Sequence, residues 1–206
     1  MIDENELKNG VNVCLSNAES LINDAELLKA NGRNERAYTL FQLASEEIGK
    51  ASQVLNFLLL EDINNPNSYK LFLKEFHSHK SKTTSFINYD YFVLKALKEI
   101  VKDKRKFLDA TVYEYNNLNL INDRKNHSLY TSIINNKFAS PRQLISIDHL
   151  NHIEFRIITR FKIAKAMIEA ALSVSFEIRE YLRVNPLNKK PLEIKAIKEF
   201  NELLKS

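Results

Sequence analysis

At 206 residues with a formal net charge of +4, the chain has the length of one domain and a mildly basic character that permits an anionic partner such as RNA without requiring one. Its three scattered glycines exclude a glycine-rich nucleotide-binding loop, and its single cysteine excludes an internal disulfide and a cysteine-based zinc site. The acidic first ten residues and the lack of a long apolar run favour a soluble, cytoplasmic protein with no membrane span.

Two long amphipathic helices are predicted first. Apolar residues recur at steps of three and four over residues 7–28, which marks one face of a helix that ends at Asn31 and Gly32. A second helix is expected over residues 33–61, and the short link makes the two helices an antiparallel hairpin. Cys14 falls in the first apolar stripe, so we interpret it as a core thiol.

The rest of the chain is predicted to be mostly helical. The expected elements are a short helix over 68–82, a helix over 89–108, an ordered polar connecting loop over 113–141 with a short extended piece at LYTSII, and one long helix from 141 to about 183 that Ser140 caps. A break at Pro186 and Pro191 separates a domain of residues 1–185 from a short C-terminal helix in 186–206. The predicted fold class is therefore all-α, with one long ordered polar loop.

An acidic residue occupies an unusual position in the second helix. Glu47 shares a stripe with Ala44 and Ala51, so its carboxylate is expected to face the core. A buried charge must be paired or hydrogen-bonded, because burying it alone is costly. We therefore interpret Glu47 as a member of an ion pair, and its neighbours Glu46 and Lys50 as a surface pair four residues apart.

A basic cluster, FHSHKSK, offers partners for that carboxylate. His79 and Lys82 lie one helical turn apart in it, and Arg124 is a third candidate partner. A di-iron helical bundle is not supported, because none of the five histidines has an acidic residue three positions before it. A histidine-only zinc site stays open as an alternative, and no metal or other cofactor is predicted.

Two later groups of residues suit RNA chemistry. Arg124, His127 and Tyr130 lie in the polar segment DRKNHSLY, where a guanidinium, an imidazole and a phenol could bind phosphate and move protons, although such segments often only connect helices. On the long helix, Arg142 and His149 are seven residues apart and share a face. The residues that continue this basic face are His152, Arg156 and Arg160. The face is either solvent-exposed or a contact for RNA or a second subunit.

Three blocks follow one another along the chain: AYTLFQLASEEIGKA, HKSK, and NDRKNHSLYTS followed by FASP. Together they resemble the AbiV family of phage-defence proteins, a branch of the all-helical HEPN superfamily, over residues 10–175. The resemblance implies an HEPN-like helical bundle and an abortive-infection protein that shuts down translation or phage gene expression once a phage-encoded trigger protein is present. Because a constitutively active toxin would kill its host, we expect a restrained state, with residues 113–141 as the element that changes.

Many HEPN proteins are homodimeric, metal-independent endoribonucleases that join an arginine and a histidine, a few residues further on, from each subunit. Arg142 and His149 fit that spacing. The predicted catalytic residues are Arg142, His149, Arg124, His127 and Glu47. The predicted supporting or RNA-binding residues are Glu46, Lys50, His79, Lys82, Tyr130, His152 and Arg156. The alternatives are a non-catalytic module that arrests translation by binding the ribosome, RNA or a phage protein, and a helical adaptor unrelated to phage.

Overall fold

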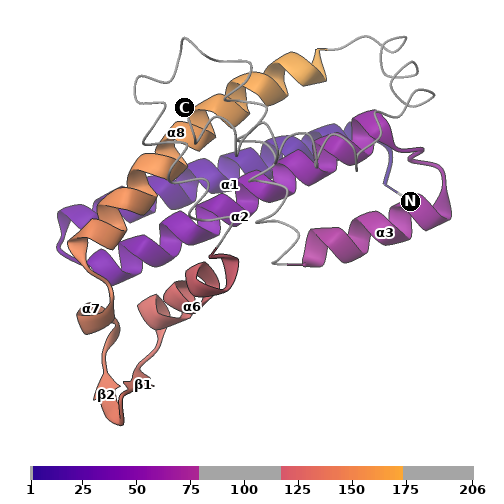
Figure 1. Cartoon of the computed structure of the whole chain (residues 1–206). Helices are drawn as coiled ribbons and strands as arrows, with labels where there is room; N and C mark the ends of the chain where they lie inside the picture. The colour runs from indigo at the N-terminus through magenta and orange to yellow at the C-terminus, as the bar shows by residue number, and fades with distance from the viewer. Residues whose placement is uncertain (1, 79–116, 174–206) are drawn as a thin grey trace, which may run out of the picture.

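The structure, a computed structural model, describes residues 2–78 and 117–173, which form a helical bundle with one small β-hairpin (Figure 1). The elements in chain order are α1 (Glu4–Ala30), α2 (Asn34–Leu60), α3 (Pro66–His77), α6 (Leu118–Leu129), β1 (Ser132–Ile134), β2 (Lys137–Ala139), α7 (Pro141–Leu144) and α8 (Ile147–Leu172). The all-α, HEPN-like fold class is confirmed. The predicted helix over 89–108, the domain boundary at 185 and the C-terminal helix lie outside the described residues.

α1 and α2 form the predicted antiparallel hairpin. The Asp3 carboxylate caps α1 by accepting a hydrogen bond from the Glu6 N–H at 2.8 Å. The chain reverses at Gly32, whose φ of +70° is a conformation that glycine adopts without a steric penalty. The predicted apolar stripe of α1 faces α2, and Cys14 is buried in it, as expected.

Small side chains let the long helices approach one another closely. The alanines with no exposed surface are Ala18, Ala25, Ala37, Ala44, Ala51 and Ala164, on α1, α2 and α8. Large side chains such as Phe41, Leu150 and Ile157 fill the remaining space, and burying each one fully stabilises the fold by roughly 1.5–3 kcal/mol. α8 runs antiparallel to α1, since Lys29 near the end of α1 pairs with Glu154 near the start of α8.

α3 is attached to α2 by an aromatic cluster. Asn65 caps it with its side-chain oxygen, and Pro66 opens its first turn, so the helix begins two residues earlier than predicted. Phe72 is its only buried residue and stacks on Phe57 of α2 with ring centroids 4.5 Å apart. α3 ends at His77. His79 and Lys82 of the predicted basic cluster lie outside the described residues.

The prediction of a connecting loop over 113–141 is wrong for the part that the structure describes. Residues 118–129 form α6, and β1 pairs with β2 in an antiparallel hairpin, with the extended piece that LYTSII suggested as its first strand. The turn residues Asn135 and Asn136 have φ of +50° and +60°, which is typical of a two-residue type I′ turn. α6 escaped detection because its inner face is mostly polar, so hydrophobic periodicity does not reveal it.

The prediction of one long helix from Pro141 is also wrong, because two helices occupy this stretch. Ser140 does cap a helix that opens at Pro141, but this helix, α7, ends at Leu144. Ser146 then begins α8, and its hydroxyl accepts a hydrogen bond from the His149 N–H at 3.2 Å. Because the helix is interrupted between them, Arg142 and His149 do not share one continuous helix face.

Candidate functional site

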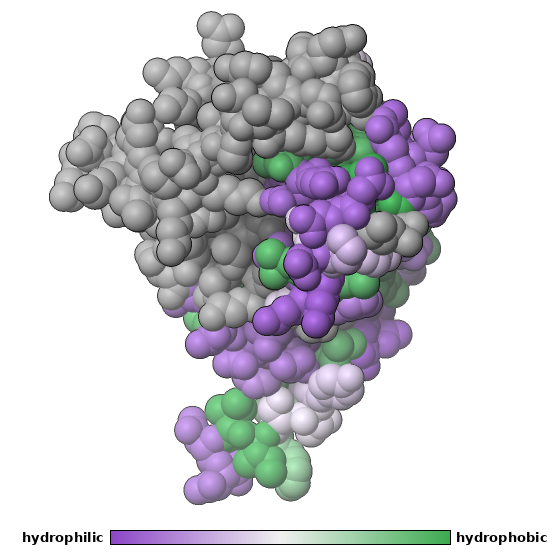
Figure 2. Space-filling view, turned by 90° about the vertical axis from the view of Figure 1, so that its right-hand side faces the viewer, coloured by the Kyte–Doolittle hydropathy of each residue, from purple (hydrophilic) through white to green (hydrophobic). Residues whose placement is uncertain are grey.

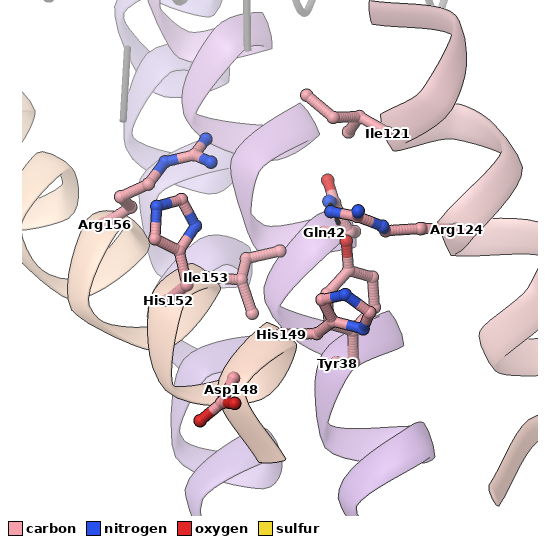
Figure 3. Close-up of a pocket in the computed structure, with 9 residues that line it drawn as sticks. All are labelled: Tyr38, Gln42, Ile121, Arg124, Asp148, His149, His152, Ile153 and Arg156. Carbon is pink, nitrogen blue, oxygen red and sulfur yellow. Dashed lines mark hydrogen bonds between the residues drawn. The ribbon is translucent and has the colours of Figure 1, made fainter. Parts of the chain in front are cut away.

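A pocket of about 310 Å³ lies between α2, α6 and α8 (Figure 3). The residues that line it are Tyr38, Gln42, Ile121, Arg124, Asp148, His149, His152, Ile153 and Arg156. α6 contributes one guanidinium, from Arg124, and α8 contributes a second guanidinium and both imidazoles. The pocket therefore combines cationic guanidinium groups with imidazoles, a side-chain type that can transfer protons.

The α8 side of the pocket follows from helical spacing. His152 and Ile153 follow His149 by three and four residues, and Arg156 follows His149 by seven, so the four residues lie on one face of α8. Figure 3 shows His152 and Arg156 side by side on this helix. Arg156 is 3% exposed and Arg160, one turn further, is 2% exposed. Of the two alternatives for this basic face, solvent exposure is therefore excluded for these two arginines, which the fold turns inward.

The α2 side of the pocket is formed by a buried phenol and an amide. Gln42 donates a hydrogen bond from Nε2 to the Tyr38 hydroxyl at 3.2 Å. Burial raises the pKa of Tyr38 above its ordinary value, while the bond from Gln42 and the charges of Arg124 and Arg156 oppose this rise. The phenol therefore stays protonated at neutral pH and can donate a hydrogen bond into the pocket. Figure 3 shows the Arg124 guanidinium beside these two groups.

His149 bonds to Ser146 both through its backbone N–H and through its ring, and so caps the first turn of α8. The Ser146 N–H donates a hydrogen bond to Nδ1 of His149 at 3.3 Å, which completes a reciprocal cap at the start of the helix. Nδ1 is therefore an acceptor, and the neutral ring carries its proton on Nε2. Burial, followed by the charge of Arg124, lowers the pKa of His149, while Asp148 opposes this with a smaller effect. The ring is consequently neutral at pH 7.

Polar contacts attach α6 to α2. Lys125 Nζ lies 2.6 Å from Glu46 Oε1, and both side chains are nearly buried. The hydroxyls of Thr39 and Ser128 are 2.7 Å apart, and Arg36 donates to the carbonyl oxygen of Leu129 at 3.3 Å. The contacts pair late residues of α6 with early residues of α2, so the two helices run antiparallel.

Glu46 and Glu47 of α2 have different partners from those predicted. Glu46 does not pair with Lys50 as a surface pair, but with Lys125 of α6. Glu47 is an ion-pair member, as predicted, and only 13% of its side chain is exposed, but its partner is Lys50 on the same helix. Its proposed partner Arg124 instead lines the pocket. The pairing that joins two helices therefore belongs to Glu46.

Four of the predicted site residues line the pocket: Arg124, His149, His152 and Arg156. Four others do not line it: Glu46 pairs with Lys125 of α6, Glu47 and Lys50 pair with each other on α2, and His127 lies in the last turn of α6. Arg142 on α7 is exposed, and Tyr130 after α6 is 65% exposed. The structure thus brings together one arginine from DRKNHSLY and the histidine of the predicted Arg142–His149 pair, but does not bring that pair together in the pocket.

Sequence reasoning missed Tyr38, Gln42 and Asp148. Tyr38 and Gln42 lie four residues apart on the buried side of α2, both less than 9% exposed. The argument that singled out Glu47 would not have found these two residues, because they fall on the side of the helix opposite the stripe of Ala44 and Ala51. Asp148 carries no signal either, since an acidic residue in a first helical turn is common.

The described residues hold neither a cluster suited to a metal ion nor a membrane-spanning helix. No group of three or more histidine, cysteine, aspartate or glutamate side chains within 2–78 and 117–173 is arranged to hold a metal ion. Over the same residues, no helix combines the length and apolar composition needed to cross a lipid bilayer.

Comparison with known proteins assigns the family. The family profile HEPN_AbiV, described as AbiV, matches residues 6–157, which is more than half of the chain. No curated protein and no solved structure matches. The match runs from the first turn of α1 through α2, α3, α6, the hairpin and α7 to the first part of α8, and therefore covers every residue that lines the pocket. The chain belongs to the AbiV family and is an abortive-infection protein of the HEPN type.

Proposed function

We propose that the pocket between α2, α6 and α8 cleaves cellular RNA, and that the protein acts in antiviral defence as an HEPN endoribonuclease that shuts down translation or phage gene expression. The observation that carries this proposal is the convergence of two guanidinium groups, two imidazoles and a phenol in one pocket of about 310 Å³. Such groups can supply the base, the acid and the cationic charge that cleavage through the RNA 2′-hydroxyl requires.

In this reaction the 2′-oxygen attacks the adjacent phosphorus, the bond to the 5′-oxygen breaks, and a 2′,3′-cyclic phosphate forms. A base takes the proton of the 2′-hydroxyl, and the departing 5′-oxygen receives a proton. The guanidinium groups of Arg124 and Arg156 suit the non-bridging phosphate oxygens, because arginine binds phosphate through two parallel hydrogen bonds. They would also stabilise the charge that develops on the phosphorus-bound oxygens.

The two histidines suit different roles. Nδ1 of His149 already accepts the Ser146 N–H, so this ring presents an Nε2–H donor and suits a phosphate oxygen. His152 lies one turn further along the same side of α8, and its imidazole suits proton transfer with the 2′-hydroxyl. The Tyr38 hydroxyl supplies a second neutral donor. The lowered pKa of His149 favours this division, because the ring stays neutral while it donates.

The proposal includes a restrained resting state. Arg156 is 3% exposed, so a phosphate reaches its guanidinium only after neighbouring groups move. This supports a protein held inactive until a phage-encoded trigger protein acts, as the family resemblance implies. We place the reaction in a homodimer, in which a second copy of the chain completes the surface that RNA contacts.

Phage infection of cells that express the full chain supplies the trigger and tests the proposal. We expect RNA fragments with 2′,3′-cyclic phosphate ends to accumulate after infection. His149→Ala, His152→Ala and Arg124→Ala should each reduce this signal by roughly 10² to 10⁴-fold and abolish phage protection. The matched controls are His77→Ala and Arg33→Ala, which remove exposed side chains of α3 and of the α1–α2 link.

Full cleavage by the three pocket variants, with the fold verified by circular dichroism, would overturn the proposal. His127→Ala separates the sequence-based prediction from the structural one, since His127 does not line the pocket. Loss of cleavage in His127→Ala together with full cleavage in His149→Ala would move the site to the end of α6. Binding of total RNA without cleavage would instead favour a non-catalytic module.

One observation favours this non-catalytic alternative. The β1–β2 hairpin projects from the end of the bundle and carries hydrophobic residues on its surface, visible at the lower end of Figure 2. Phe138 is 80% exposed and Ile133, opposite it in the hairpin, is 65% exposed. Exposed apolar residues of this kind often contact another protein. If Phe138→Ser abolishes phage protection while cleavage persists, arrest by binding a ribosomal or phage partner becomes the better explanation.

A further inference from the structure

We infer that Glu46 is a positioning residue for the pocket: by pairing with Lys125 it fixes α6 against α2 and so holds Arg124 at the pocket. Its effect on cleavage rests on the proposed function, whereas its effect on the position of Arg124 does not. The inference follows from how α6 is attached, from the burial of the pair and from the adjacency of Arg124 and Lys125.

α6 has little apolar surface with which to hold itself in place. Among its described side chains, Ile121 is the only buried apolar one, and Leu120 is 40% exposed. The inner face continues four and seven residues later with Lys125 and Ser128, both polar. Helices of globular proteins usually stay in place because they bury an apolar face, so α6 depends unusually strongly on its polar contacts.

Three side-chain contacts between α2 and α6 were described above. The Glu46–Lys125 pair is the one that joins two opposite charges. Its oxygen and nitrogen are 2.6 Å apart, which is typical of a strong charge-assisted hydrogen bond. Only 13% of the glutamate side chain and 14% of the lysine side chain are exposed, so water does little to weaken their attraction. Removing one partner would leave a nearly buried charge behind, which strongly disfavours the docked helix.

Arg124 depends on this contact because it precedes Lys125 directly. Successive residues of an α-helix point about 100° apart, so a helix that turns Lys125 toward α2 turns Arg124 to the side. On that side lies the pocket, where Arg124 meets residues of α2 and α8 (Figure 3). Glu47 differs from Glu46 in this respect, because its partner Lys50 belongs to α2 and the pair does not link α2 to α6.

The titration of His149, followed by NMR on the full chain, reports where Arg124 lies. The charged and titratable groups of the pocket around this ring are Arg124 on α6, Asp148, His152 and Arg156 on α8, and Tyr38 on α2. Arg124 lowers the pKa of His149, so its departure should raise that pKa toward the ordinary value. We expect this rise in Glu46→Gln and not in Glu47→Gln, with both variants folded by circular dichroism.

The sign of the change makes this test specific. Removing a negative charge acts directly on a histidine by lowering its pKa, which is opposite to the expected rise. Arg124→Gln alone should raise the pKa of His149. Combined with Glu46→Gln, it should cause no rise beyond that of Glu46→Gln alone. An unchanged or lowered pKa in Glu46→Gln, or full additivity of the two substitutions, would overturn the inference.

Kinetics then separate this inference from the proposed function. If the protein cleaves RNA, Glu46→Gln should reduce kcat/KM by roughly 10²-fold, as misplacement of a binding group does, while Glu19→Gln at an exposed α1–α8 ion pair has no effect. If the titration behaves as expected and no RNA is cleaved, the positioning role stands and the proposed function fails. If the titration moves while kcat/KM does not, the position of Arg124 is irrelevant to cleavage and the catalytic part of the inference is wrong.

Discussion

The buried hydroxyl pair between α2 and α6 permits a worked prediction of stability. Thr39 and Ser128 are 3% and 0% exposed, and their oxygens are 2.7 Å apart. Each hydroxyl has one proton. Ser128 donates its proton to the carbonyl oxygen of Lys125 at 2.6 Å, so Thr39 must donate to Ser128. The longer contact from Thr39 to the carbonyl oxygen of Glu35, at 3.2 Å, shares the same proton.

This arrangement sets the size of each effect. Thr39→Val keeps the shape of the side chain and leaves the Ser128 proton bonded, so we expect a loss of about 1 kcal/mol, the net value of one hydrogen bond. Ser128→Ala removes two bonds, but the Thr39 proton can still reach Glu35, and a loss of about 1–2 kcal/mol follows. In the double variant the shared bond is lost once, so the combined cost should fall short of the sum by about 0.5–1.5 kcal/mol.

Urea unfolding followed by circular dichroism measures these differences, and about 1 kcal/mol corresponds to a shift in Tm of about 2–4 °C in a chain of this size. Ser20→Ala is the control, because its exposed hydroxyl bonds only to the Ser16 carbonyl of its own helix and its loss should change stability by less than about 0.5 kcal/mol. Single effects that add to within about 0.3 kcal/mol would refute the reasoning, since they would show no interaction across the two helices.

Two further predictions concern the core and pH. Leu150→Ala, at a position with no exposed surface, should cost about 2–5 kcal/mol, whereas Leu27→Ala, at 64% exposure, should cost less than about 0.5 kcal/mol; equal losses in urea unfolding would contradict the described core. Folding lowers the pKa of His149 from 6.5, so the unfolded chain binds more protons at this residue than the folded chain does as the pH falls below that value. The stability from this group is therefore complete above pH 6.5 and is lost as the pH falls, and His149→Gln should show a shallower loss between pH 7 and 5.

The sequence predicted the parts of the fold that depend on apolar burial. The stripes of α1 and α2 recur at helical spacing because those faces pack on each other, so periodicity located both helices to within a few residues. α6 was not found, because its inner face holds Lys125 and Ser128 in place of apolar residues. The division between α7 and α8 was missed because Ser146 forms its reciprocal cap with a histidine, where the usual pattern has glutamate or glutamine.

The candidate site was only partly predictable, because its members come from helices far apart in the chain. Arg124 and His149 were identified for separate reasons, and nothing in the sequence indicates that they lie in one pocket. Glu46 and Glu47 are neighbours, and which of them pairs across helices depends on Lys125, 79 residues away. The basic face of α8 was recognised, but its direction was not. Only the packing of α8 against α2 shows that Arg156 faces inward.

The shielding of the Glu46–Lys125 pair means that two parts of the protein should respond differently to ionic strength. Raising the concentration of sodium chloride weakens contacts between nucleic-acid phosphates and arginines, because condensed counterions are no longer released as favourably. A pair that is nearly excluded from water is screened far less. If the pocket binds RNA as proposed, the RNA phosphate should therefore dissociate from Arg124 at salt concentrations that leave α6 docked, and the pocket should bind RNA again when the salt is diluted.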